Sequence, residues 1–133
     1  MNEDVLGCKT LLLMKNILKE KSFALALRII KLYKFLIENK KEYVLSKQIL
    51  RSGTSVGAMI REAQNAESKM DFVHKLAIAQ KECDETIYWM ELLVQSDYIS
   101  KEAFESVSAE AEQVLKMIKS AILTTKRNIV IKK

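Results

Sequence analysis

The sequence contains no proline and only three glycines, Gly7, Gly53 and Gly57, among its 133 residues. An average chain has about 5% proline and 7% glycine, and these two residues form most turns. Their scarcity argues against sheets with tight turns and against long irregular loops. Alanine, leucine, lysine and glutamate, which favour helices, are abundant instead. The composition therefore predicts an all-α fold with short connections, and the length suits one domain with its own core.

Cysteines and long apolar runs are also scarce. Cys8 and Cys83 are too far apart for a Cys-x-x-Cys metal motif, and Cys83 falls in an apolar helical row. The apolar run at 11–14 is far shorter than the ~20 residues that cross a bilayer. The chain opens with acidic residues rather than the basic start of a signal peptide. We therefore expect a reduced, cytoplasmic protein that neither is secreted nor enters a membrane.

Histidine is nearly absent, which limits the chemistry available to the chain. A nucleophilic serine, threonine or cysteine needs a positioned base, and only His74 could serve. Asp71-x-x-His74 resembles half of the ligand set of a di-metal helical bundle, which needs a second such motif. Its possible companions would be Glu62, Glu67, Glu82 and Glu85. We predict no enzyme, no cofactor and no metal, and keep a carboxylate-metal bundle enzyme as a distant alternative.

Four segments show the 3.6-residue periodicity of amphipathic helices. They cover about 22–39, 43–65, 68–96 and 100–125, with Ser68 and Ser100 suited to cap the last two. The short connections favour an antiparallel, up-down-up-down four-helix bundle over residues 22–125. Residues 1–21 form a lead segment with one more apolar run, whose conformation the pattern does not define, and residues 126–133 form a basic C-terminal tail.

The segment 22–39 is apolar around most of its circumference. Two apolar rows run along it, and its polar stripe is narrow. A helix of this kind needs more cover than neighbouring helices of one small bundle easily give. This pattern predicts that identical chains associate.

Small residues interrupt the second helical segment at 51–58, which reads RSGTSVGA. Gly53 and Gly57 lie on one helix face, where they permit close approach of another helix, inside the chain or in an oligomer. A phosphate-binding loop is the alternative, but the P-loop spacing that ends in Gly-Lys-Ser/Thr is missing. Trp89 is expected to anchor the core or a subunit interface, with stacking on an RNA base as the other reading.

Charge is distributed unevenly, with acids concentrated at 82–112 and bases at 28–51 and 116–133. A basic surface of this kind suits nucleic acid, and it suits equally well an acidic surface of the same chain or of a neighbouring subunit. The residues that would contact nucleic acid are Arg28, Lys31, Lys34, Lys40, Lys41, Lys47 and Arg51.

Several segments together resemble the 23S rRNA intervening-sequence proteins. They are KSFALA at 21–26, QILRSGTSVGA at 48–58, DFVHKLAIA at 71–79 and ETIYW at 85–89. The resemblance covers about residues 15–125 and implies an antiparallel four-helix bundle assembled as a homopentameric ring. It is similar also to the accessory variability determinant protein of diversity-generating retroelements, which binds a reverse transcriptase and nucleic acid. Met59 departs from the family, which more often has asparagine there.

Polar residues at the matching positions predict an ion network between the second and third helices, with a ligand or RNA surface as the alternative. Its members are Arg51, Glu62, Lys81, Glu82 and Glu85. The resulting hypothesis is a non-enzymatic scaffold that self-associates and binds RNA or a nucleic-acid-processing protein through its basic residues. An adaptor that binds only protein is the alternative.

Overall fold

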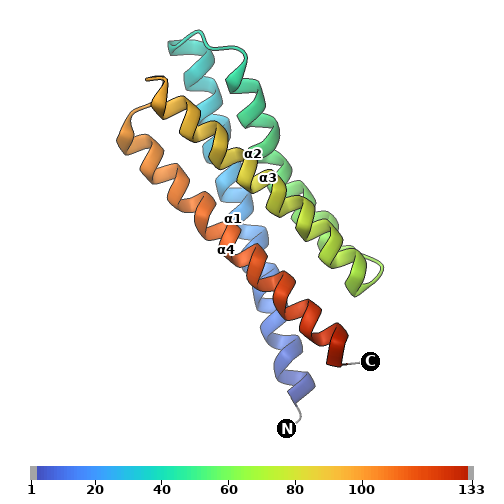
Figure 1. Cartoon of the computed structure of the whole chain (residues 1–133). Helices are drawn as coiled ribbons and strands as arrows, with labels where there is room; N and C mark the ends of the chain where they lie inside the picture. Colours follow the sequence, from blue (N-terminus) through green and yellow to red (C-terminus); the bar gives the residue numbers. More distant parts are fainter. Residues whose placement is uncertain (1–2, 132–133) are drawn as a thin grey trace.

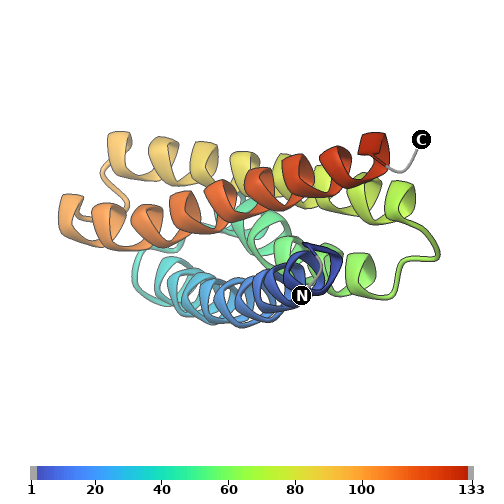
Figure 2. The ribbon, with the colours of Figure 1, turned by 90° about the horizontal axis from the view of Figure 1, so that it is seen from below.

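The protein folds into four helices and has no strand in the part that the structure describes. The structure, a computed structural model, describes the backbone of residues 3–131 and the side chains of residues 9–129. The helices are α1 (Glu3–Asn39), α2 (Leu45–Gln64), α3 (Lys69–Gln95) and α4 (Lys101–Ile131). Short connections turn the chain back at alternating ends (Figure 1), and α3 and α4 lie as one layer over α1 and α2 (Figure 2). The predicted all-α class and the four packed helices are confirmed.

Two helix ends lie beyond the predicted boundaries. The first helix begins at Glu3 rather than Ser22, and the fourth continues to Ile131 rather than ending near Thr125. The early part of α1 is held by other helices: Gln64 Nε2 donates to the carbonyl of Lys15 at 2.8 Å, and the Lys15 amine lies 4.8 Å from the centre of the Phe72 ring. The division into lead segment, bundle and tail stays a prediction, although helix runs through both of its boundaries.

Serine side chains cap α3 and α4 as expected. The Ser68 hydroxyl accepts from the Asp71 amide at 3.0 Å, and Asp71 accepts in return from the Glu67 amide at 3.3 Å. Ser100 accepts from the Ala103 amide at 3.1 Å. Each bond to a serine hydroxyl satisfies a backbone donor that the first turn of a helix would leave free. The two predicted N-caps are confirmed.

The cap of α2 is a carboxylate that the sequence pattern did not reveal. Glu42 is nearly buried, and its two oxygens accept from the amides of Val44, Leu45 and Ser46 at 2.8–3.3 Å. A negative charge at this position also favours the positive end of the helix dipole. Glu42 therefore fixes the start of α2 although it lies three residues outside that helix.

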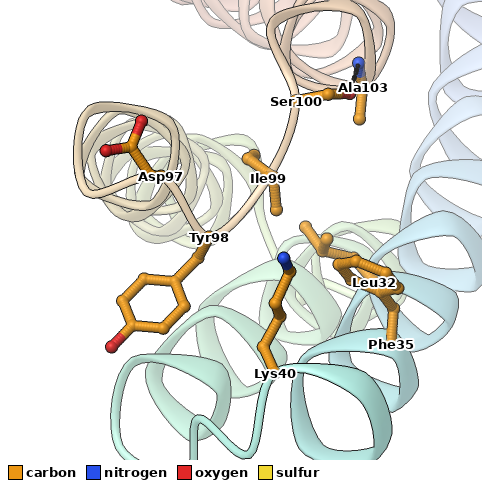
Figure 3. A pocket seen from close by; sticks show the side chains of 8 residues that line it. All are labelled: Leu32, Phe35, Lys40, Asp97, Tyr98, Ile99, Ser100 and Ala103. Carbon is orange, nitrogen blue, oxygen red and sulfur yellow. Dashed lines mark hydrogen bonds between the residues drawn. The ribbon is translucent and has the colours of Figure 1, made fainter.

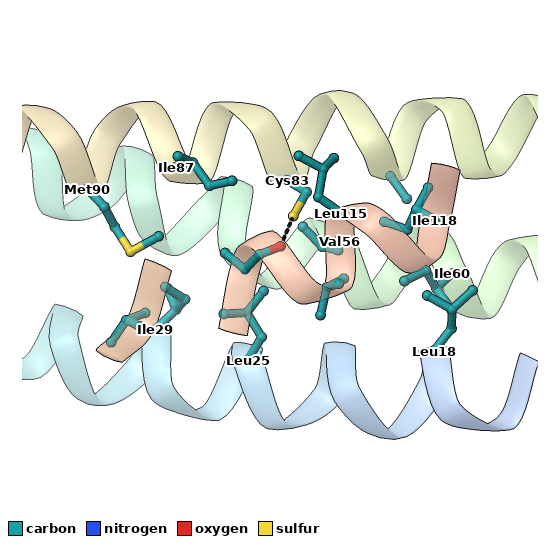
Figure 4. Packing of buried hydrophobic residues seen from close by; sticks show 14 of the residues in the cluster. Leu18, Leu25, Ile29, Val56, Ile60, Cys83, Ile87, Met90, Leu115 and Ile118 are labelled. Carbon is teal, nitrogen blue, oxygen red and sulfur yellow. Dashed lines mark hydrogen bonds between the residues drawn. The ribbon is translucent and has the colours of Figure 1, made fainter. Parts of the chain in front are cut away.

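The core runs along the bundle axis and receives side chains from all four helices (Figure 4). Cys83 lies within it, and its Sγ donates to the carbonyl of Ala111 on α4 at 3.3 Å. Burial, with the negative charges of Asp84 and Glu112 adding to it, raises the pKa of the Cys83 thiol to about 12. The thiol is thus protonated at neutral pH, and Cys83 is an inert core residue as expected. The side chain of Cys8 lies outside the described residues.

Candidate interaction surface on α1 and α2

The two helical glycines of α2 both face α1. A Cβ atom on Gly53 would lie 2.7 Å from Ile29 Cγ2, closer than real Cβ contacts, whereas one on Gly57 would lie 3.5 Å from Ser22 Oγ. Ile29 and Ser22 are buried. Gly53 is therefore accounted for by close helix packing inside one chain, whereas Gly57 leaves room for a methyl group.

The opposite side of this stretch meets α3 through polar groups. Arg51 Nη1 lies 3.0 Å from Glu82 Oε2, and Arg51 Nη2 lies 2.6 Å from Glu85 Oε1. The hydrogen bond to Glu85, with the charge of both carboxylates, raises the pKa of the Arg51 guanidinium above its usual value. One residue along, the hydroxyls of Ser52 and Thr86 lie 2.9 Å apart and are buried.

The other members of the predicted network lie elsewhere. Glu62 pairs with Lys75 at 3.3 Å, one more contact between α2 and α3. Lys81 is exposed and makes no ion pair with the described residues. The structure thus brings Arg51, Glu82 and Glu85 together, places Glu62 in a second pair, and leaves Lys81 on the surface. Lys75 has the correct charge, but only the register of two helices could identify it as the partner of Glu62.

The predicted nucleic-acid-binding residues divide into two sets. Arg28 is paired with Glu110 of α4 at 3.0 Å, and Arg51 is paired with α3. The others are exposed and make no ion pair within the described part of the chain. They are Lys31 and Lys34 on α1, Lys40 and Lys41 in the α1–α2 connection, and Lys47 on α2. Five lysines are therefore free to meet a negatively charged partner.

An apolar stripe lies on the outer face of α1 beside these lysines. Phe23 and Leu27 are 51% and 49% exposed, and Ile30, on the same face by helical spacing, is half-buried. Next to the stripe is a shallow groove of about 260 Å³ between α1 and α2, lined among others by Ala26 and Gly57. The Arg61 guanidinium lies 5.6 Å from the centre of the Phe23 ring. We call Phe23, Leu27 and Ile30 the α1 stripe.

Trp89 lies half-buried on α3 against the core. Its ring centre is 5.1 Å from that of Tyr88, which is exposed. The buried Trp89 Nε1 has no hydrogen-bond partner among the described residues. The packing of Trp89 against the core agrees with the predicted core or interface anchor, whereas nothing in the sequence indicates that its indole nitrogen lacks a partner in the described part of the chain.

The carboxylates of the metal alternative are spread over separate contacts. Asp71 caps α3, Glu62 pairs with Lys75, and Glu82 and Glu85 share Arg51. Within the described residues, no three histidine, cysteine or acidic side chains come close enough to hold a metal ion. His74 is exposed on α3. Across the same part of the chain, none of the helices combines the length and the apolar character needed to cross a membrane.

Comparisons with known proteins agree with this architecture. No match was found among curated proteins. A solved structure of a Bacteroides thetaiotaomicron protein of unknown function, from the S23 ribosomal protein family, is similar with a TM-score of 0.81. The two sequences are 51% identical over 82% of this chain and 97% of the other. The family model for 23S rRNA-intervening sequence proteins matches residues 14–120, and the chain therefore belongs to the 23S rRNA-intervening sequence protein family.

Proposed function

We propose that this protein is a non-enzymatic scaffold whose antiparallel four-helix bundles assemble into a homopentameric ring, and that the ring binds RNA. The observation that carries the proposal is the combination on α1 of an exposed apolar stripe with unpaired lysines. The cytoplasm, where RNA is accessible and thiols stay reduced, is the proposed location.

The α1 stripe supports the association of identical chains. Phe23 and Leu27 expose about half of their side chains although the opposite face of α1 is fully packed. Large apolar side chains grouped on one exposed face mark sites of protein association. Lys19 and Arg61 border this face together with one acid, Glu20. Because α3 and α4 carry 9 of the 17 acids, unlike surfaces of two copies would attract each other. Contacts between unlike surfaces close into a ring when the rotation that relates neighbouring copies returns to the first copy.

Light scattering tests this assembly. The variant Phe23→Ser/Leu27→Ser should dissociate to smaller species while keeping its helical circular dichroism. Leu123→Ser is the matched control, because Leu123 on α4 is 52% exposed but lies outside the stripe. An unmodified protein that is monomeric at micromolar concentration would end the proposal of a ring, and equal dissociation of both variants would remove the role of the stripe.

The unpaired lysines support the RNA part of the proposal. Phosphates attract lysines that have no acidic partner, and binding then releases counterions, so affinity falls steeply with salt. We expect Lys31→Gln/Lys34→Gln to weaken binding to single-stranded RNA and to lower the salt slope by about 0.7 for each lysine. Lys116→Gln/Lys119→Gln, two exposed lysines of α4, is the matched control. Binding that does not depend on salt, or that falls equally in both variants, would contradict this surface.

A second candidate is an adaptor that binds only protein. The pairing of Arg28 with Glu110 and of Arg51 with Glu82 and Glu85 favours it, because part of the basic charge is already matched inside the chain. The adaptor predicts no RNA after purification from the native host, but a co-purifying protein whose retention requires the α1 stripe.

A further inference from the structure

A pocket of about 530 Å³ lies at the end of the bundle where two connections meet (Figure 3). It is lined by the end of α1, the α1–α2 connection, the α3–α4 connection and the first turn of α4, and it is open to solvent. Its size falls within the range of about 300–1,000 Å³ that is usual for small-molecule sites. Of the residues assigned above to association or RNA binding, only Lys40 lines this pocket.

The wall of the pocket is mainly apolar. Leu32 and Phe35 line it from α1, Ile99 from the α3–α4 connection and Ala103 from α4. Ile99 is buried, whereas Phe35 is 39% exposed and so offers part of its ring to a ligand. Apolar walls with few polar groups are typical of sites that bind small organic molecules.

Backbone hydrogen bonds hold the wall in place. Two hydrogen bonds close the end of α3. The Tyr98 amide donates to the Leu93 carbonyl at 2.9 Å, and the Asp97 amide donates to the Val94 carbonyl at 3.2 Å. Asp97 has the positive φ, 65°, that this closure requires. On the other side, the Glu42 amide donates to the Leu36 carbonyl at 3.0 Å. The pocket is therefore preformed, which lowers the entropy lost when a ligand binds.

Lys40 is the positively charged residue that lines the pocket. Its amine extends toward Ile99 in Figure 3 and lies 5.9 Å from the centre of the Phe35 ring. It makes no ion pair with any described residue, and the carboxylate of Asp97 points away from it in the same view. An ammonium group next to an apolar wall and without an acid partner is suited to bind an anionic group of a ligand.

We propose that this pocket binds a small aromatic carboxylate with a single negative charge. The aromatic body would lie against Leu32, Phe35 and Ile99, and the carboxylate would accept from the Lys40 amine. The first turn of α4, capped by Ser100, adds a positive helix end to the same side. Asp97 at the rim disfavours ligands that carry more negative charge.

Binding of 1-naphthoate to the full-length protein tests the proposal, with 1-naphthalenemethanol as the uncharged counterpart. Calorimetry should give saturable binding of one naphthoate per chain and clearly weaker binding of the alcohol. Lys40→Gln should weaken naphthoate binding about two- to fivefold, because the Lys40 side chain is exposed and solvent screens its charge. Lys41→Gln is the matched control, because Lys41 is the next residue but does not line the pocket.

A second pair of variants tests the cavity itself. Ala103→Phe should fill the space and abolish binding, whereas Ala109→Phe, on the exposed surface of α4, should bind as the wild type does. Circular dichroism checks that each variant folds. Four results would overturn the proposal: no saturation at millimolar naphthoate, equal affinity for the alcohol, equal loss in Lys40→Gln and Lys41→Gln, or full binding by a folded Ala103→Phe protein.

Discussion

The contacts of α2 with α1 and with α3 differ in which side chains they can accept. Toward α1, Gly53 leaves no space for even a methyl group beside Ile29. Toward α3, residues of the same stretch meet Thr86, Glu82 and Glu85 through hydrogen bonds and ion pairs. The contact with α1 accepts only a residue small enough to fit beside Ile29, whereas the contact with α3 requires side chains that can pair with its polar groups.

This difference explains the unusual composition of residues 51–58. The two faces of this stretch meet different helices. It therefore needs glycine, which has no side chain, on the face toward α1, and a hydroxyl or guanidinium group on the face toward α3. Polar pairs between helices can fix their register, whereas close apolar contact sets their separation. The stretch thus specifies how α1, α2 and α3 are arranged.

The largest effect is expected where size limits the contact. Gly53→Leu should destabilise the protein by about 3 kcal/mol, because the side chain would overlap Ile29, which is fully buried and cannot move away. Urea unfolding followed by circular dichroism measures the change. Ala58→Leu is the control, since Ala58 is exposed on the same helix. If both variants unfold at the same urea concentration, the contact between α1 and α2 is not limited by size.

Removing a hydroxyl from the contact with α3 should have the next largest effect. Thr86→Val leaves the buried Ser52 hydroxyl with only the Ile49 carbonyl, at 3.4 Å. A buried polar group without a good partner costs about 1–2 kcal/mol. Because the double variant Ser52→Ala/Thr86→Val leaves no unpaired hydroxyl, its loss should be smaller than the sum of the two single losses. Strict additivity in this double-mutant cycle would show that the two hydroxyls do not interact.

Much of the fold follows from the sequence because its helices are strongly periodic. The ends of α3 were predictable to within one residue, since Ser68 is a good N-cap and the apolar row ends near Ser96. The start of α1 was not, because residues before Ser22 are held by tertiary contacts such as that of Lys15 with Gln64. The pattern of apolar and polar residues within one segment does not reveal its contacts with distant segments.

The interaction surface was predictable only in part. Helical spacing places Arg51 on a face that could meet acids of α3, and the structure puts it beside Glu82 and Glu85. Spacing cannot tell which bases are already paired, so Arg28 and the free lysines look equivalent in the sequence. The pocket at Lys40 could not be predicted either, because it forms where two connections, distant in the sequence, meet.

Gly57→Ala should have a smaller effect of opposite sign. A Cβ atom at Gly57 would be in ordinary contact with Ser22 at 3.5 Å, and the φ of Gly57 is not positive. Alanine then restricts the unfolded chain and favours helix, so we expect a gain of about 0.4–1 kcal/mol. The urea midpoint should rise without a change in slope. A clear loss of stability would mean that the size limit extends from Gly53 to Gly57.

The smallest effect is expected at an exposed ion pair between α2 and α3. Glu85→Gln removes one of the two carboxylates of Arg51, whose side chain is 50% exposed, so solvent screens the pair. Exposed ion pairs contribute about 0.2–1 kcal/mol, and Glu82 remains to hold the guanidinium. The difference from wild type should therefore be near the lower end of that range and should shrink between 50 mM and 500 mM salt. A larger loss that does not depend on salt would show that Arg51 and Glu85 act as a desolvated pair, and the contact of α2 with α3 would then depend on that pair more than on the hydroxyls beneath it.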